Sequence, residues 1–387
     1  MSSSAPHSER RLRAGIVGGG RGAFIGAVHR MAAELDGRAE IVAGALSSDP
    51  QTAQLSAAGW FLRRAYIAVE EMALAEAAAP EGIDFVIVAV PNHLHYPVVR
   101  AFLAAGIHVV CDKPLALSVA EGEQLAPLLA SGSLLFALTQ TYTGYPAVRE
   151  ARALVAAGEL GRLHRVMVEY TQDWLREPLE TQGQKQAAWR TDPARSGQAG
   201  SLGDIGVHAQ NLLEYVSGQT ISSVCADLNR VVAGRQLDDD ASVLLRLSGG
   251  ARGVLVCSQI ATGDENALSL RLYGSKAGLA WHHEDPDTLI HKPAGAPWRR
   301  LRRGHAYLSD AARAATRLPP GHPEGYIEAF ANLYRAFCAD VCRVKRGEPP
   351  LRDYPGLEEG LRSLRFIEAV LASSRADSAW TTVGTGR

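Results

Sequence analysis

The sequence predicts an α/β protein with a doubly wound parallel sheet in its N-terminal part and an α+β unit with a large, mostly antiparallel sheet in its C-terminal part. Two observations carry this prediction. Short apolar strands alternate with helices up to residue 139, which is the rhythm of a parallel sheet covered on both faces. Beyond residue 140 several strands follow one another without helices between them, which favours an antiparallel sheet with one face covered and one face free.

In the N-terminal part, strands and helices are expected in strict alternation. The strands are expected at residues 12–17, 40–46, 65–66, 84–90, 107–111 and 134–139. The helices are expected at residues 24–35, 51–58, 69–78, 95–105 and 118–131. The strand at 84–90 is the clearest, because a short and continuous β-branched run is typical of a parallel strand buried on both faces.

In the C-terminal part, the pattern changes to longer strands in direct succession. Strands are expected at residues 163–172, 221–232, 240–248, 251–260 and 267–273, and helices at 146–157, 204–217, 323–346 and 355–374. Ser248-Gly249-Gly250 predicts a hairpin turn between two of these strands. Residues 175–199 are polar and residues 284–322 are rich in Pro, Gly and Arg, so we expect irregular loops in both segments.

Length and composition exclude several classes of protein. A chain of 387 residues is too long for one ordinary core, and two domains are expected. The formal net charge of -1 argues against a nucleic-acid or acidic membrane partner. No stretch approaches the ~18 apolar residues of a membrane span, and the polar first ten residues, expected to form a disordered tail, lack an apolar signal core. The five scattered cysteines predict free thiols in a cytoplasmic protein rather than a metal site.

A glycine-rich segment follows the first predicted strand. Gly18, Gly20 and Ala23 fit the G-x-G-x-x-G/A fingerprint, in which glycines allow a tight turn and a close approach to a pyrophosphate at a helix N-terminus. The fingerprint predicts a Rossmann domain that binds a dinucleotide. A glycine-rich turn is a weak signal by itself, so the prediction of a dinucleotide site also depends on the residues at the ends of the other strands.

The end of the second strand bears on the choice of dinucleotide. Ser47 and Ser48 stand where sites that prefer NAD usually carry an acidic residue for the ribose 2′-hydroxyl. The missing acid removes repulsion of a 2′-phosphate, and Arg21 in the first loop could reach such a group. We therefore expect NAD or NADP.

Polar residues follow two further strands. Residues 91–95 (Pro-Asn-His-Leu-His) come after the strand at 84–90, and Asp112-Lys113-Pro114 comes after the strand at 107–111. Ligands of open α/β sheets bind outside the carboxyl ends of the strands, so both segments are expected to line the cofactor crevice. The alternatives are a helix-capping Asn92 and a solvated surface lysine. The proline after Lys113 moves the lysine backbone away from the helical region and permits a cis peptide bond.

Asp204 and His208 lie four residues apart, so on a helix they share one face. Taken alone, the pair is better explained by a helix-capping Asp204 and a buried core histidine than by a catalytic pair. No third ligand is near in sequence, and we expect no metal site.

Together these features resemble the Gfo/Idh/MocA family of sugar and cyclitol oxidoreductases, from residue 12 to about residue 370. The matching features are the glycine loop 18–23, Pro91-Asn92-His93-Leu94-His95, Asp112-Lys113-Pro114, Trp189-Arg190, Asp204-x-Gly206-x-His208, residues 273–278 and Gly325-Tyr326. Three departures are visible: an extended segment at 22–26, Asp112 where the family usually has Glu, and Ala199-Gly200-Ser201 where it often has three glycines. The extended segment at 22–26 could alter how the glycine loop binds the pyrophosphate. The change at residues 199–201 is not expected to disturb the chemistry.

The resemblance implies that Lys113, Asp204 and His208 form the catalytic group. Oxidation of a secondary alcohol removes the hydroxyl proton while hydride leaves the same carbon, and a neutral histidine, with a reference pKa of about 6.5, suits the role of base. A lysine cation would stabilise the developing alkoxide. Asp204 would bind a neighbouring hydroxyl or tune the other two.

The remaining site residues follow from the motifs and the resemblance. The expected cofactor-binding residues are Gly18, Gly20, Arg21, Ala23, Ser47, Ser48, Pro91, Asn92, His95, Asp112, Lys113, Trp189 and Arg190. The expected substrate-binding residues are Lys113, Tyr142, Trp174, Asp204, His208 and Tyr326. Aromatic faces beside hydroxyl-binding side chains suit a pyranose or cyclitol ring. Residues 11–139 are expected to bind the dinucleotide, and residues 140–387 the substrate and a further copy of the chain.

The expected function is NAD(P)-dependent hydride transfer between nicotinamide and a secondary alcohol of a sugar, glycoside or cyclitol. Two alternatives stay open: a glycosidase of the same family that retains its NAD, and a non-catalytic dinucleotide-binding regulator whose second domain binds a protein. The missing secretion signal argues against the first, and the presence of all three catalytic side chains argues against the second. The free face of the second sheet predicts a homodimer or homotetramer.

Overall fold

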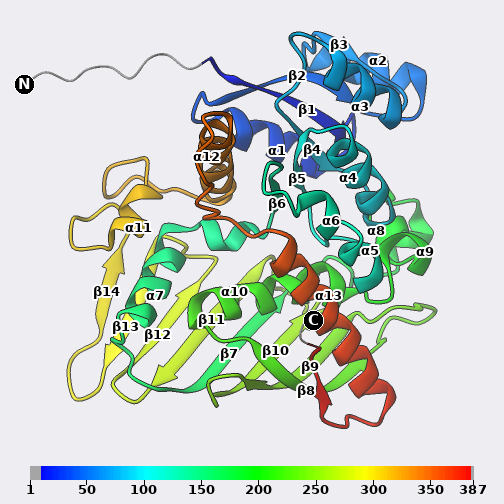
Figure 1. The fold of residues 1–387 in the computed structure, drawn as a ribbon. Coiled ribbons are helices and arrows are strands. Elements are labelled where there is room, and N and C mark those ends of the chain that lie inside the picture. Colours follow the sequence, from blue (N-terminus) through cyan, green and yellow to red (C-terminus); the bar gives the residue numbers. More distant parts are fainter. Residues whose placement is uncertain (1–9, 385–387) are drawn as a thin grey trace, which may run out of the picture.

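The computed structural model describes residues 10–384, and the predicted tail at 1–10 lies outside this range except for Arg10. Two sheets form the framework of the chain (Figure 1). The first has six parallel strands in the order β3-β2-β1-β4-β5-β6. Its strands are β1 (Leu12–Gly18), β2 (Ala39–Ala45), β3 (Arg64–Ala65), β4 (Phe85–Ala89), β5 (His108–Cys111) and β6 (Phe136–Leu138). The prediction of a doubly wound parallel sheet is confirmed.

The centre of this sheet is the point where the strand order reverses. β1 pairs with β2 on one side and with β4 on the other, and the chain leaves the two halves of the sheet in opposite directions. β4 is buried along its whole length, in agreement with its continuous apolar sequence. At such a switch point the loops after the neighbouring strands diverge and open a crevice.

Helices cover both faces of the first sheet. They are α1 (Phe24–Glu34), α2 (Pro50–Gly59), α3 (Val69–Ala78), α4 (His95–Ala104), α5 (Val119–Glu123) and α6 (Ala126–Leu129). The single helix predicted at 118–131 is wrong, because the chain forms two short helices there instead. Pro127 has no N–H to donate to the carbonyl of Glu123, so one continuous helix cannot form across this point.

The second sheet has nine strands in the order β14-β13-β12-β11-β7-β10-β9-β8-β15. They are β7 (Leu163–Thr171), β8 (Ile221–Asn229), β9 (Asp240–Leu247), β10 (Arg252–Ser258), β11 (Ala267–Gly274), β12 (Ala277–His282), β13 (Thr288–Pro293), β14 (Arg299–Arg302) and β15 (Thr381–Thr382). Only the β7–β10 pair is parallel, and the predicted hairpin at 248–250 joins the antiparallel strands β9 and β10. The predicted large, mostly antiparallel sheet is confirmed.

The irregular loop predicted at 284–322 is wrong. This segment contributes β13, β14 and the short helix α11 (Asp310–Ala314), and β12 and β15 were also not predicted. The Pro and Gly residues mark the turns between short strands, and pairing with β12 gives these strands their hydrogen bonds. Leu289 of β13 lies opposite the buried Trp281 of β12, so a contact between strands stabilises a segment that looks irregular in sequence.

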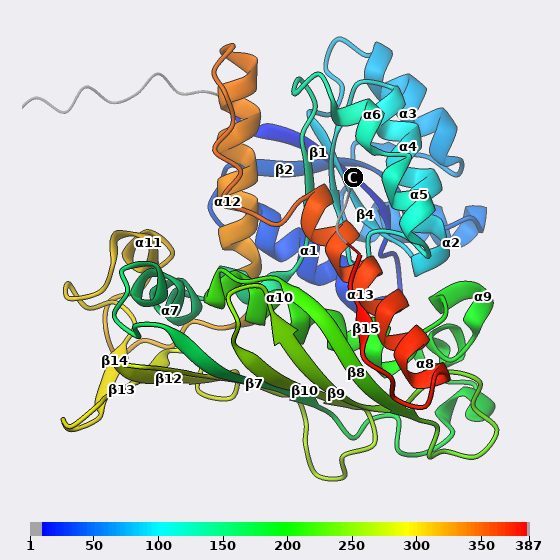
Figure 2. The same ribbon diagram turned by 60° about the horizontal axis from the view of Figure 1, so that its bottom comes forward.

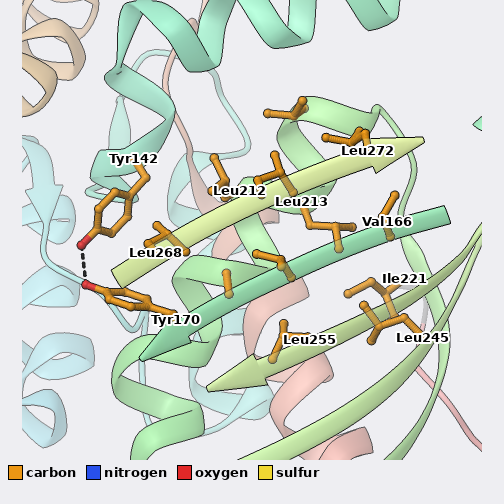
Figure 3. Packing of buried hydrophobic residues seen from close by; sticks show 14 of the residues in the cluster. Tyr142, Val166, Tyr170, Leu212, Leu213, Ile221, Leu245, Leu255, Leu268 and Leu272 are labelled. Carbon is orange, nitrogen blue, oxygen red and sulfur yellow. Dashed lines mark hydrogen bonds between the residues drawn. The ribbon is translucent and has the colours of Figure 1, made fainter. Parts of the chain in front are cut away.

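Three helices cover one face of the second sheet: α7 (Pro146–Ala156), α10 (Val207–Ser217) and α13 (Leu357–Arg375) (Figure 2). Figure 3 shows Leu212 and Leu213 of α10 above Val166, Leu255 and Leu268 of the sheet, all of them buried. The opposite face carries the alternate residues of the same strands, and Leu244 on β9 is 47% exposed there.

Helix α12 (Tyr326–Lys345) returns from the C-terminal part of the chain to the first sheet (Figure 1). Its residues Phe330 and Phe337 share a buried cluster with Phe85 of β4, and the helix packs against α1. The first residue of α12, Tyr326, is thereby placed beside the crevice of the first sheet.

The segment 175–199, predicted as a loop, contains two short helices, α8 (Lys185–Arg190) and α9 (Pro193–Ser196). Gln184 and Asp192 cap their N-termini through side-chain hydrogen bonds. No helix in residues 10–384 is long and apolar enough to cross a membrane.

Candidate active site

A cavity of about 570 Å³ lies at the carboxyl ends of the strands of the first sheet. Residues of both sheets and of the connections between them line it. Every residue predicted for cofactor or substrate binding lies on its wall, from Gly18 in the first loop to Tyr326 at the start of α12. The structure therefore brings the whole predicted set together, whereas their individual roles stay predictions.

The glycine loop forms one end of the cavity with no room for side chains. A Cβ atom on Gly18 would lie 2.4 Å from the carbonyl oxygen of Ala89, and a Cβ on Gly20 would lie 2.5 Å from that of Leu46. Gly18 also has a φ of 79°, in the left-handed region that favours glycine. The backbone can thus come close to a ligand, as the dinucleotide fingerprint requires.

Helix α1 begins directly after this loop. Ala23 is its N-terminal cap residue, and no side chain caps the free N–H groups of the first turn. The close packing expected of the third fingerprint position is made by Gly26, because a Cβ there would lie 2.3 Å from the Cα of Gly19. The uncapped helix end and the side-chain-free cradle fit the pyrophosphate of a dinucleotide.

The end of β2 presents hydroxyl groups to the cavity rather than a carboxylate. Ser47 and Ser48 line the wall. Asp49 does not line the cavity. Its carboxylate accepts a hydrogen bond from the backbone N–H of Thr52 and caps α2. The backbone N–H of Arg21 donates to the hydroxyl of Ser56 on α2, so the glycine loop is tied to this end of the cavity.

The two loops that follow β4 and β5 are held together by His95. Its ring lies between the carbonyl oxygens of Val90 and Pro114, and the residue is almost completely buried. Asn92 does not cap a helix through its side chain; its amide donates to the carbonyl of Ser196 on α9, at 3.0 Å. The Lys113–Pro114 peptide bond is cis, as the sequence permits.

Lys113 and Asp204 form a salt bridge across the cavity. The ammonium Nζ of Lys113 lies 2.8 Å from Oδ1 of Asp204 and also donates to the Asp204 carbonyl. Since an ammonium group has three N–H bonds, one remains for a further acceptor. Neither side chain is a solvated surface group, because both are largely buried.

Asp204 has two more partners on its other carboxylate oxygen. Gln259 donates to Oδ2 at 2.9 Å, and Arg190 of α8 donates at 3.3 Å. Burial alone would raise the pKa of Asp204, but the charges of Lys113 and Arg190 hold it well below its usual range. Asp204 is therefore an ionised anchor for Lys113 and no proton acceptor near neutral pH.

The backbone that carries Asp204 is a π-helical turn (Leu202–Gly206), which continues into α10 with His208 in its first turn. The buried Asp238 holds the start of this turn. Its carboxylate accepts hydrogen bonds from the N–H of Gly200, the hydroxyl of Ser201 and the N–H of Leu202, at 2.7 to 2.8 Å. The serine that replaces the third glycine of the family pattern is thus used to fix the helix carrying Asp204 and His208.

His208 is held in its neutral form at the floor of the cavity. Burial, followed by the charge of Lys113, lowers its pKa to about 3. Its ring meets that of Tyr142 edge to face, with centroids 5.0 Å apart. Nδ1 is buried and has no hydrogen-bond partner among the residues that the structure describes.

The wall on the side of the second sheet is a chain of hydrogen bonds between polar side chains. Tyr142 and Tyr170 are joined through their hydroxyls (Figure 3), and Tyr170 donates to Asn266 at 2.7 Å. Gln172 donates to the same Asn266 oxygen and accepts the indole N–H of Trp174 at 3.1 Å. This wall has the amphipathic surface that a ring with several hydroxyls requires.

Sequence reasoning placed Arg190 at the cofactor but missed its contact with Asp204, where it also stacks on Trp189 at 4.2 Å. It missed Gln259 and Asp238 altogether. Gln259 follows the end of β10, and Asp238 is one of three consecutive aspartates, so no motif distinguishes either residue. Within residues 10–384 no group of three or more His, Cys, Asp or Glu side chains could hold a metal ion.

Comparison with known proteins agrees with this geometry. An oxidoreductase of Sinorhizobium meliloti is 44% identical, with 96% of this chain and 99% of that one covered and a TM-score of 0.87. An inositol dehydrogenase homologue of Azotobacter vinelandii, solved with NAD+, is 33% identical, with 96% and 97% covered and a TM-score of 0.93. An uncharacterised oxidoreductase of Bacillus subtilis is 32% identical, with 95% of this chain and 96% of that protein covered.

Two family models match the chain in succession. The oxidoreductase family with an NAD-binding Rossmann fold matches residues 12–139, and the GFO/IDH/MocA C-terminal domain matches residues 148–280. The chain therefore belongs to the Gfo/Idh/MocA family of NAD-binding oxidoreductases.

Proposed function

We propose that the protein transfers a hydride between a secondary alcohol of a sugar, glycoside or cyclitol and the nicotinamide of NAD or NADP. The observation that carries this proposal is the Lys113–Asp204 salt bridge beside a neutral, partly buried His208 on the wall of a cavity whose other end is a glycine cradle. In this assignment residues 11–139 bind the cofactor, and residues 140–387 bind the substrate.

Each of the three side chains has a separate task in alcohol oxidation. His208 accepts the hydroxyl proton, because it is uncharged near neutral pH. Lys113 donates its remaining N–H to the same oxygen and stabilises the negative charge that develops there. Asp204, ionised and bound on both oxygens, fixes the lysine ammonium in place. The nicotinamide, when bound, accepts the hydride that leaves the carbon.

The substrate class is inferred from the polar wall of the second sheet. Trp174 offers a flat apolar face, and Tyr142 and Gln172 offer groups that bind hydroxyls. The Azotobacter vinelandii inositol dehydrogenase homologue has also been solved in complex with NADH and myo-inositol, and the chain in that structure is 32% identical to this one. Levoglucosan dehydrogenase of Pseudarthrobacter phenanthrenivorans is 26% identical over 54% of this chain. Both support a ring polyol for this site.

A panel of inositols, free sugars and glycosides, each tested with NAD and with NADP, tests the function. We expect net nicotinamide reduction with at least one ring polyol. Reduction with non-carbohydrate alcohols alone, or no reduction with any substrate, would contradict the proposal. Release of a sugar from a glycoside without net reduction would instead support a glycosidase that retains its NAD.

The same panel tests the choice of cofactor. The carboxylate nearest to the end of β2 belongs to Asp49, which caps α2 and does not line the cavity, so it does not replace the missing acid. We therefore expect NADP to support turnover within about tenfold of NAD, a difference of about 1.4 kcal/mol or less. Ser47→Asp is the control: it should reduce the use of NADP while NAD continues to work. Equal loss with both cofactors would show that Ser47 does not face the ribose.

We propose further that the free face of the nine-stranded sheet carries self-association. Leu244, Val254 and Met167 lie side by side in register on β9, β10 and β7, and none of them is buried by the three helices on the other face. Leu244→Glu together with Val254→Glu should convert a dimer or tetramer into monomers in analytical ultracentrifugation, because burial of two carboxylates is costly. An unchanged sedimentation coefficient would place the interface elsewhere.

A further inference from the structure

His29 is a buried histidine behind the loop that carries Lys113. It lies on α1, has no exposed surface, and packs edge to face on Phe330 of α12 with centroids 5.0 Å apart. Its Nδ1 is 2.6 Å from the hydroxyl of Tyr334, also on α12. His29 does not line the cavity, so it touches neither substrate nor cofactor there.

The other ring nitrogen of His29 faces Asp112. Nε2 lies 3.7 Å from Oδ2 of Asp112 and has no hydrogen-bond partner among the described residues. Burial raises the pKa of Tyr334, so its hydroxyl keeps its proton and can donate to Nδ1. When the hydroxyl donates in this direction, the single proton of a neutral ring is on Nε2, the ring nitrogen nearer to Asp112. At 3.7 Å the two groups are in electrostatic contact, at a distance longer than a hydrogen bond.

Asp112 in turn holds the lysine loop. Its Oδ1 accepts the backbone N–H of Lys113 at 2.7 Å and the hydroxyl of Thr139 at 3.1 Å. Burial alone would raise the pKa of Asp112, but His29, followed by Lys113, holds it well below its usual range. Asp112 is therefore a carboxylate held on one oxygen by the Lys113 backbone and by Thr139, which directly follows β6, while its second oxygen lies nearer to His29.

We infer that His29 is a positioning residue: through Asp112 it fixes the backbone at Lys113 and so the direction in which the lysine ammonium points. The inference rests on the proposed catalytic role of Lys113. Placement is worth much at such a site, because a shift of about 1 Å in a reacting group can cost about a hundredfold in rate. Since α1 also begins in the glycine loop, the helix that would meet the cofactor is the one that orients the lysine.

Two amide substitutions separate this role from simple packing. Asn places its amide near Nδ1 of histidine and cannot reach Asp112, whereas Gln places its amide near Nε2 and can. We expect His29→Asn to lower kcat about ten- to hundredfold, and His29→Gln to keep kcat within about threefold of the wild type. The KM for the alcohol and the Kd for NADH should change little in both, because His29 lies outside the cavity.

A matched control comes from a second buried histidine. His108 lies at the opposite end of β5 and accepts the backbone N–H of Leu135 through Nδ1. His108→Asn also removes a buried imidazole from the same layer, so it should lower the melting temperature while leaving kcat within about twofold. Equal kcat losses in His29→Asn and His108→Asn would show a general effect of destabilisation and would overturn the inference.

A double-mutant cycle with Asp112→Asn tests the proposed route. If His29 acts through Asp112, the double variant should turn over no more slowly than Asp112→Asn alone. If the losses of kcat in the two single variants multiply in the double variant, the inference is contradicted. A wild-type kcat in His29→Asn would also contradict it.

A crystal structure of His29→Asn gives a readout that does not depend on turnover. It should show Asp112 rotated away from the Lys113 backbone, with Asp204 unmoved. If no substrate is found for the wild type, the proposed function fails, and an unmoved Asp112 would still contradict the positioning role by itself.

Discussion

Lys113→Met is expected to lower kcat about a thousandfold or more while NADH binding changes little. Lys113 is the only described cation that bonds Asp204 through Oδ1, and it lines the cavity. Methionine has nearly the same length but neither charge nor donor, so the oxyanion of the reacting alcohol loses its stabilisation. Removing one preorganised donor of this kind usually costs about 10² to 10³ in rate, and the lost full charge adds to that.

Cofactor binding should persist in this variant because the glycine cradle and the N-terminus of α1 are separate from Lys113. Asp204 also keeps Arg190 and Gln259, so its carboxylate remains paired. The measurement is kcat and KM for the best substrate of the panel, with NADH binding followed by fluorescence. Lys292→Met, on β13 outside the cavity, is the matched control and should retain full activity. Near-normal turnover in Lys113→Met would remove the lysine from the mechanism.

His208→Ala is expected to lower kcat/KM for alcohol oxidation about 10²- to 10⁴-fold across the measured pH range. In the wild type, oxidation requires unprotonated His208, so activity falls as the pH falls through the histidine pKa. Burial and the charge of Lys113 lower that pKa to about 3, against about 6.5 for a free histidine. The acid limb should therefore lie well below pH 6.5. Titration of His208 should leave kcat/KM nearly unchanged between pH 6 and pH 8.

The profile is measured as kcat/KM between pH 4.5 and 9, in a range where circular dichroism shows the fold to be intact. His208→Gln serves as the second variant, because it keeps volume and polarity but accepts no proton. A wild-type limb centred near pH 6.5 would show that the ring is not desolvated as the structure has it. An unchanged kcat/KM in His208→Ala would assign the base to another group.

Much of the fold can be predicted from the sequence, because each parallel strand of the first sheet is a short apolar run bounded by turn residues. Residues 84–90 predict β4 in this way. The polar residues that directly follow β4 and β5 predict the edge of the sheet at which the site lies. The second sheet was predicted only where strands alternate strongly. β13 and β14 were missed since their stability comes from pairing with neighbouring strands rather than from their own pattern.

The motif residues and their order can be recognised without coordinates, because backbone sterics and hydrophobic periodicity are local properties. The glycine loop is predicted from such a local pattern, whereas the family resemblance singles out Lys113, Asp204 and His208. The contacts between these groups depend on the folded chain. Gln259 and Arg190 bind Asp204, Asp238 holds the turn that carries Asp204, and His29 lies behind Asp112. These contacts join segments from 14 to 83 residues apart, and charge, burial and pKa depend on such neighbours in space, which no local pattern encodes.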